Sequence, residues 1–421
     1  MEDERSNTSL LPSFTTTKEG IALKSFKSFL TWICLDQSNP WKTTLSYSIF
    51  FLLTIAIPIL NHIIYASCKT CDSHHLRPYD SIIQLSLFSV STLSFLCLSS
   101  FTHNYGIKRF LFLDKLGHSS DKVRQGYVDQ LQRSAKILAS FVLPIFVIDG
   151  GYKIWWFVSA GNVYVYDMIA CVLQMCSWLY RTAIFFVVCV LFRLICYLQI
   201  LKLEEFARVF EKESDVGNIL TEHLKIRRNL RIISHRFRVF VLMTVVLVTM
   251  SQLASLLVTT KAGSTVDVYT AGELALCSIT LVTGLFICLR SATKITHRAQ
   301  SITSLATKWH VCATINSFDD FDGNTPTTPS RVSHTDANWD SDNDGEEENG
   351  DDDDLDNTKM IPIFSISISY QKRQALVNYF EQNKAGITVF GFVLDRTSIH
   401  MMFVIQMSLT LWLLNKTIGF S

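Results

Sequence analysis

The chain has 421 residues, of which 48% are apolar and 18% are charged, and its formal net charge at pH 7 is +1. This composition is unusual for a soluble protein and typical of one whose solvent is lipid. The near-neutral balance hides a strong segregation of charge along the chain, and we expect membrane lipids rather than nucleic acid as its surroundings.

Seven apolar runs are long enough to cross a bilayer, for which a helix needs about 20 residues. They are Thr44 to Ala66, Ser81 to Phe101, Ile137 to Val158, Met168 to Leu191, Phe240 to Thr259, Ala271 to Leu289, and Ile399 to Ile418. The last is the shortest in its wholly apolar part, and a second apolar patch, Ile387 to Leu394, precedes it. The sequence therefore predicts an all-α membrane protein with seven transmembrane helices.

Lysine and arginine are concentrated in alternate connecting segments, namely those before span one and after spans two, four and six. The other loops are nearly bare, with Lys69 and Arg77 after span one and Lys261 after span five. Basic loops stay in the cytosol, and no cleavable signal is predicted ahead of the first span. We therefore expect a cytosolic amino terminus and an extracellular carboxyl terminus, which argues against a G-protein-coupled receptor.

The segments outside the spans predict four regions. They are a cytosolic segment at 1–43, six transmembrane helices with cytosolic extensions at 44–317, an acidic cytosolic linker at 318–361, and a cytosolic helix with the last span at 362–421. Within the first region, Ile21 to Ile33 has an apolar face beside Lys24 and Lys27. This pattern is typical of a helix in the membrane interface, or of one packed on the protein's own surface.

Three further segments are predicted on the cytosolic side. From Leu198 to Arg238, apolar residues recur at helical spacing with a break at Ser214 to Gly217, which predicts a helical hairpin and an extended cytosolic stem. The stretch Asp340 to Asp356 is too charged to fold and lacks the ligand arrangement of an EF-hand, so we interpret it as a disordered linker. Tyr370 to Lys384 predicts a polar helix that leads to the last span.

Ionisable residues at membrane depth are functional candidates by default. Asp149 in span three has Lys153 one turn later, Arg181 is near the middle of span four, and Glu273 is near the outer end of span six. They form either an internal ion pair that fixes helix packing or the polar floor of an outward-facing ligand pocket. The aromatic residues nearby predict an interfacial belt or the walls of such a pocket. The candidate pocket for an unidentified small molecule comprises Asp149, Tyr152, Trp155, Trp156, Tyr180, Arg181 and Glu273.

The last span carries a sparse polar stripe between bulky apolar residues. Phe403, Gln406 or Met407, and Thr410 recur at a spacing of three to four. Such a stripe suits a pore that opens by wetting a hydrophobic constriction, and it also suits hydrogen bonding between helices.

Other chemistry is weakly signalled. Cys68 and Cys71 could form a disulfide, remain free thiols or, with neighbouring histidines, bind zinc. No nucleotide-binding glycine loop, metalloprotease pair or catalytic triad pattern occurs, so we expect neither an enzyme nor a resident cofactor or metal.

The tract from Ile387 to Gly419, together with the layout of the whole chain, resembles the seven-helix channel superfamily of insect odorant and gustatory receptors. It resembles more closely the plant gustatory-receptor-like branch of that superfamily. Ile399 and His400 stand where the insect receptors have Thr and Tyr, and Gln406 matches outright. The resemblance implies a homotetramer whose shared pore is lined by the last helix, with Gln406 and Phe403 facing the pore and Phe403 near the gate.

These observations predict a multi-pass, ligand-gated cation channel in the plasma membrane or another endomembrane. One alternative is a non-conducting sensor or scaffold that recruits partners through the acidic loop. Another is a secondary transporter, for which internal repeats are expected and none is found in the sequence.

Overall fold

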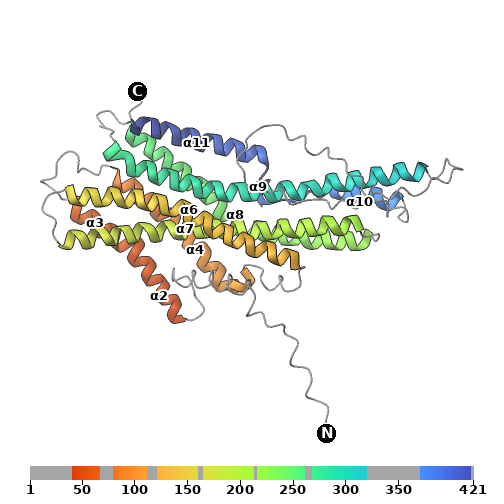
Figure 1. Ribbon diagram of the computed structural model, residues 1–421, viewed down its shortest axis with the longest axis horizontal. Helices are drawn as coiled ribbons and strands as arrows, with labels where there is room; N and C mark the ends of the chain where they lie inside the picture. Colours follow the sequence, from red (N-terminus) through yellow and green to blue (C-terminus); the bar gives the residue numbers. More distant parts are fainter. Residues whose placement is uncertain are drawn as a thin grey trace, which may run out of the picture. The chain divides into compact units, whose positions relative to one another are not determined.

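The computed structural model describes residues 40–66, 79–110, 121–159, 165–212, 216–260, 268–319 and 370–418 (Figure 1). In chain order, its elements are α2 (Pro40–Phe51), the π-helix η1 (Leu52–Ala56), α3 (Ile57–Ala66), α4 (Asp80–Phe110), α6 (Asp121–Ser159), α7 (Val165–Lys212), α8 (Val216–Thr259), α9 (Val268–Asp319), α10 (Tyr370–Gln382), β1 (Thr388–Val389), β2 (Phe392–Val393) and α11 (Arg396–Ile418). The described chain is almost entirely helical, as the hydropathy pattern predicts.

Six helical segments of the described chain are long and apolar enough to cross a membrane. They are Trp41–Ile63, Asp80–His103, Gln125–Trp155, Met168–Arg208, Val216–Thr259 and Gly272–Val311. The first six predicted runs fall on these segments, which confirms a multi-pass helical architecture. The seventh run forms α11, whose 23 residues extend about 34 Å, although its apolar part, Ile399–Asn415, is shorter than the other six. A seventh crossing therefore stays a prediction.

The α7 helix has the most buried membrane segment. In its most apolar stretch 83% of residues are buried, compared with 17% in the first span. Its buried positions occur all round the helix, among them Phe185, Phe186 and Phe192. The first span and α8 instead leave many large apolar side chains exposed, such as Leu60 and Leu257. A row of exposed apolar side chains is what a lipid-facing helix surface requires.

The first span is interrupted in the middle. The π-helix η1 separates α2 from α3, with the Ile57 N–H bonded to the Leu52 carbonyl, and Pro58 follows directly. In a π-helix the next hydrogen bond would run from the N–H of residue 58 to the Leu53 carbonyl. Proline has no N–H, so the Leu53 carbonyl lacks this backbone donor. The hydroxyl of Ser177 on α7 donates to that carbonyl at 2.5 Å. The interhelical bond thus supplies the partner that proline cannot.

Replacing Ser177 with Ala should reduce stability by about 0.6–1.7 kcal/mol, the range for a hydrogen bond between membrane helices. The loss should be smaller in a Pro58→Ala background, because an alanine at that position provides its own N–H for the freed carbonyl. The measurement is a double-mutant cycle of thermal unfolding in detergent. Equal losses in the two backgrounds would disconnect Ser177 from the proline.

The chain divides into two units. One contains the described parts of residues 1–205, 224–300 and 385–421, and the other those of 206–223 and 301–384. The described part of α7 ends at Lys212 and α8 begins at Val216. Residues 213–215, where the hairpin break is predicted, lie outside the described residues. The predicted polar helix is α10. In the second unit its buried Phe380 packs edge-on against His223, with ring centroids 4.6 Å apart.

The apolar patch at Ile387 to Leu394 forms a short antiparallel hairpin of β1 and β2 rather than part of a helix. It joins α10 to α11. Several predictions lie outside the described residues: the interfacial helix at Ile21 to Ile33, the acidic linker and the Cys68–Cys71 pair.

Candidate functional site

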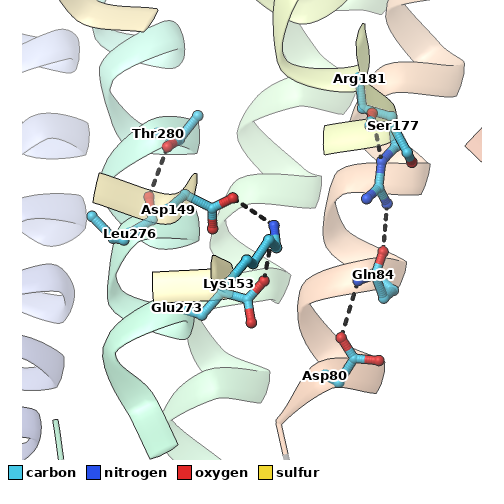
Figure 2. A network of polar contacts seen from close by, with 9 residues as sticks. All are labelled: Asp80, Gln84, Asp149, Lys153, Ser177, Arg181, Glu273, Leu276 and Thr280. Carbon is cyan, nitrogen blue, oxygen red and sulfur yellow. Dashed lines mark hydrogen bonds and ion pairs between the residues drawn. The ribbon is translucent and has the colours of Figure 1, made fainter. Parts of the chain in front are cut away.

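Three ionisable side chains meet in the first unit between α6 and α9 (Figure 2). Lys153 Nζ lies 2.5 Å from Asp149 Oδ2, one turn earlier on α6, and 3.3 Å from Glu273 Oε1 on α9. The second contact is an ion pair by distance, because Glu273 Oε1 receives no aligned hydrogen bond from the described residues. Asp149 and Lys153 are each 1% exposed and Glu273 is 5% exposed. One buried cation is thus shared by two carboxylates from different helices.

The ammonium group also has an aromatic neighbour. Lys153 Nζ lies 5.7 Å from the centroid of the Trp178 ring on α7, within the range of a cation–π interaction. Trp178 is itself buried. Lys153 therefore connects α6, α7 and α9.

A second network surrounds Arg181 on α7 (Figure 2). Its Nη1 donates to Gln84 Oε1 at 2.7 Å, and its Nε donates to the Ser177 carbonyl at 3.4 Å. The amide nitrogen of Gln84 donates in turn to Asp80 Oδ1 at 3.0 Å, and the other oxygen of Asp80 lies 3.2 Å from His62 Nδ1. A polar chain thus runs from a fully buried arginine to His62, whose side chain is half exposed.

Together the two networks contain two cations, Lys153 and Arg181, and three carboxylates, Asp80, Asp149 and Glu273. Burial of isolated charges in the hydrocarbon region is expensive, so each must have partners there. The carboxylates come from α4, α6 and α9, and the cations from α6 and α7. The arrangement therefore ties four membrane helices together.

The other predicted pocket residues occupy mixed positions. Tyr152 and Trp155 have ring centroids 6.2 Å apart, and Trp155 is exposed. Tyr180 is half-buried, and the side chain of Trp156 lies outside the described part of the chain. The structure brings Asp149 and Glu273 together through Lys153, and it places Arg181 in the separate network with Gln84.

The polar stripe of α11 faces α8. Gln252 Nε2 donates to Thr410 Oγ1 at 2.7 Å and contacts the Gln406 carbonyl at 3.3 Å, while Gln406 Nε2 donates to Thr249 Oγ1 at 2.6 Å. Gln406 and Thr410 are each 4% exposed. Ser278 of α9 adds an acceptor 3.4 Å from Gln252 Nε2. The stripe therefore forms hydrogen bonds between helices of the same chain.

The remaining predicted pore residues are half-buried. Phe403 packs on Phe286 of α9 with ring centroids 4.8 Å apart, and Met407 is also half-buried. Among the described side chains of α11, the exposed large apolar ones are Met401, Val404, Ile405, Leu411 and Trp412.

Several partners were missing from the sequence prediction. Asp80 and Gln84 stand four residues apart, a spacing that places them on one helix face, and this signal was available. Thr249 and Gln252 stand three residues apart in a mainly apolar run, which places them on one face of α8. Ser177 carries no such signal, because a lone serine in a membrane helix is common.

The fold and its buried ion networks define a multi-pass helical membrane protein with ionisable side chains at membrane depth. The family model described as "Protein of unknown function (DUF3537)" matches residues 21–405, and the chain belongs to this family. A comparison with curated proteins gave no match.

Proposed function

We propose that the chain is one subunit of a homotetrameric, ligand-gated cation channel in which α11 is the seventh membrane span and lines the pore. The alternation of basic and bare connectors supports a cytosolic amino terminus and an extracellular carboxyl terminus. The extensions of α7, α8 and α9 then form a cytosolic stem. The likeness of the tract from Ile387 to Gly419 to the gustatory-receptor-like channels supports the pore assignment.

The observation that carries the proposal is the polar contact between α8 and α11. A pore closed by a hydrophobic constriction keeps its polar side chains away from the axis. Here Gln406 and Thr410 are hydrogen-bonded to α8, and from Met401 to Trp412 the large exposed side chains of α11 are apolar. A rotation of α11 that breaks the bond from Gln252 would turn a polar stripe toward the axis and wet the pore.

The free energy needed to break the hydrogen bonds between α11 and α8 is modest. Hydrogen bonds between membrane helices contribute about 0.6 kcal/mol each on average. A ligand can shift the equilibrium between the closed and open channel only by its differential affinity for these two states. Because only a few such bonds must break, a small difference in affinity is enough to open the channel. In the proposal, the ligand binds on the outer side near Tyr152 and Trp155, and competes for the partners of Lys153 or Arg181.

Replacing Phe403 with Ala should raise the resting cation leak, because it removes the aromatic contact that holds α11 against Phe286. The measurement is cation flux into liposomes that contain the purified protein, with patch recording for single events. Leu257→Ala is the matched control, since this side chain on α8 is 72% exposed and should leave the flux unchanged. Membranes that stay tight with both the parent and Phe403→Ala would contradict the channel proposal.

A secondary transporter is the second candidate. Transporters place discontinuous helices and ionisable groups near the bilayer midplane, and the interruption at η1 together with the Lys153 and Arg181 networks fits that description. The same liposomes distinguish the two. A transporter gives slow flux that requires a driving gradient of a second solute, whereas a channel gives unitary currents without one.

A further inference from the structure

The hairpin between α10 and α11 has an unusual turn. Thr388 pairs with Val393 and Val389 pairs with Phe392, which leaves Phe390 and Gly391 at the tip. Both have positive φ, 49° for Phe390 and 92° for Gly391, as the two central residues of a type I′ turn do. Glycine adopts this conformation freely, but a bulky residue there is strained. An aromatic residue whose backbone is held in this strained conformation at an exposed tip suggests a role beyond folding.

The hairpin is fixed to two membrane helices. The Ile387 N–H donates to Thr296 Oγ1 on α9 at 3.2 Å, and the Thr388 N–H donates to Ser234 Oγ on α8 at 3.1 Å. Ile387, Val389 and Leu394 are buried. The inner side of the hairpin is therefore a packed part of the first unit, and its position along α8 and α9 is set by these contacts.

The outer side is apolar and exposed. Phe392 is 79% exposed, Phe390 53% and Val393 43%. These three exposed apolar side chains, two of them aromatic, lie within four residues at the end of the hairpin and need an apolar environment. We name Phe390, Phe392 and Val393 the hairpin tip.

The exposed surface of α8 locates the hairpin tip relative to the bilayer. Arg231 and His235 are exposed, and from Val239 onward the exposed large side chains of this helix are apolar. Polar exposed residues thus give way to lipid-facing ones between His235 and Val239. The hydrogen bond from Thr388 joins α8 at Ser234, about 7.5 Å along the helix axis before Val239. The hairpin is therefore attached where the headgroup layer begins.

Two more observations place the hairpin at the start of the headgroup layer. The guanidinium carbon of Arg238 lies 5.1 Å from the centroid of the Phe390 ring, so the tip reaches the residue that precedes Val239. At the start of α11, Arg396 and the preceding Asp395 are exposed, and the exposed large apolar side chains of the helix begin at Met401. Interfacial segments bury Phe at the boundary between headgroups and acyl chains and keep Lys or Arg at the headgroups, as Phe390 and Arg238 would be here.

We propose that the hairpin tip is an interfacial anchor that inserts Phe390 and Phe392 into the headgroup layer of the bilayer, at the same end of the spans as the basic segments. Arg238 would then lie among lipid phosphates, with which its charge is complementary. This anchor would fix the depth of the start of α11, whatever that helix conducts. The inference does not rest on the channel proposal.

A nitroxide spin label at Phe392→Cys tests the anchor in vesicles of phosphatidylcholine and phosphatidylserine. Oxygen concentrates in the bilayer and a water-soluble nickel chelate stays outside, so the ratio of their collision rates reports depth. We expect a ratio severalfold higher at position 392 than at Arg231→Cys, and close to that at Val239→Cys. The parent chain, labelled in parallel, supplies the background from its native cysteines. A second label at Val393→Cys should follow position 392.

Two outcomes would overturn the inference. A ratio at position 392 equal to that at Arg231→Cys would place the hairpin tip in water. An immobilised label with dipolar broadening between copies would show that a second copy of the chain, rather than lipid, covers it. Because Phe392 is largely exposed, its replacement should leave folding intact, and monodisperse elution in detergent checks this.

Discussion

Replacing Lys153 with Met should destabilise the protein by about 3–5 kcal/mol, which makes it one of the two most damaging single changes that we expect. Lys153 is 1% exposed and is the cation shared by Asp149 and Glu273. Without it, the two carboxylates lose the cation between them and remain buried close together. The expected result is a large fall in the apparent melting temperature in detergent. Size-exclusion chromatography with fluorescence detection, after heating, measures this temperature.

The control neutralises the whole group. Adding Asp149→Asn and Glu273→Gln to Lys153→Met leaves a site of similar volume without buried charge, and should recover most of the lost stability. Recovery would assign the loss to uncompensated charge rather than to packing against Trp178. If Lys153→Met melts like the parent, the ion pairs do not hold α6 to α9.

The same group shows how far sequence reasoning reaches. Asp149 and Lys153 stand four residues apart on one helix, so their pairing was predictable from the spacing alone. The addition of Glu273 required knowledge that α6 packs against α9, and helical periodicity says which residues share a face but not which helix that face meets. Arg181 was identified as a candidate because it is an ionisable residue in the middle of a span, and its partner Gln84 was not identified.

The last helix gives a similar result. The spacing of Gln406 and Thr410 identified a polar stripe, and two uses of it were open, a pore lining and a bond between helices. The contacts with Thr249 and Gln252 show the second use in this structure. The first would require α11 to move, which stays a prediction.

The hairpin before α11 was visible in the sequence only as an apolar patch. Its glycine, Gly391, is a turn signal, but the positive φ at Phe390 runs against the preference of bulky residues. The first strand of the hairpin is held by hydrogen bonds from Ile387 and Thr388 to Thr296 and Ser234, which belong to distant parts of the chain. Tertiary contacts of this kind override local propensity, and no window of sequence contains them.

Replacing Gly284 with Ala should destabilise the protein by about 1–3 kcal/mol, although the same change in an ordinary helix is favourable. An added Cβ would lie 2.2 Å from Phe185 Cε1 and 2.6 Å from its Cζ. Phe185 on α7 is 2% exposed, so its ring has no free space to move into. Gly284 therefore permits the close approach of α9 to α7, as small residues do between membrane helices.

The two glycine substitutions should change the melting temperature in different directions, which separates a steric clash from a general effect of alanine. Gly151→Ala on α6 is the matched control, because nothing among the described residues lies within 4 Å of its added Cβ, and it should leave the melting temperature unchanged or slightly raised. Gly284→Ala combined with Phe185→Leu should regain part of the loss, since the smaller side chain vacates the space that the new methyl group needs. If Gly284→Ala alone is as stable as the control, α7 and α9 are not packed closely through this glycine.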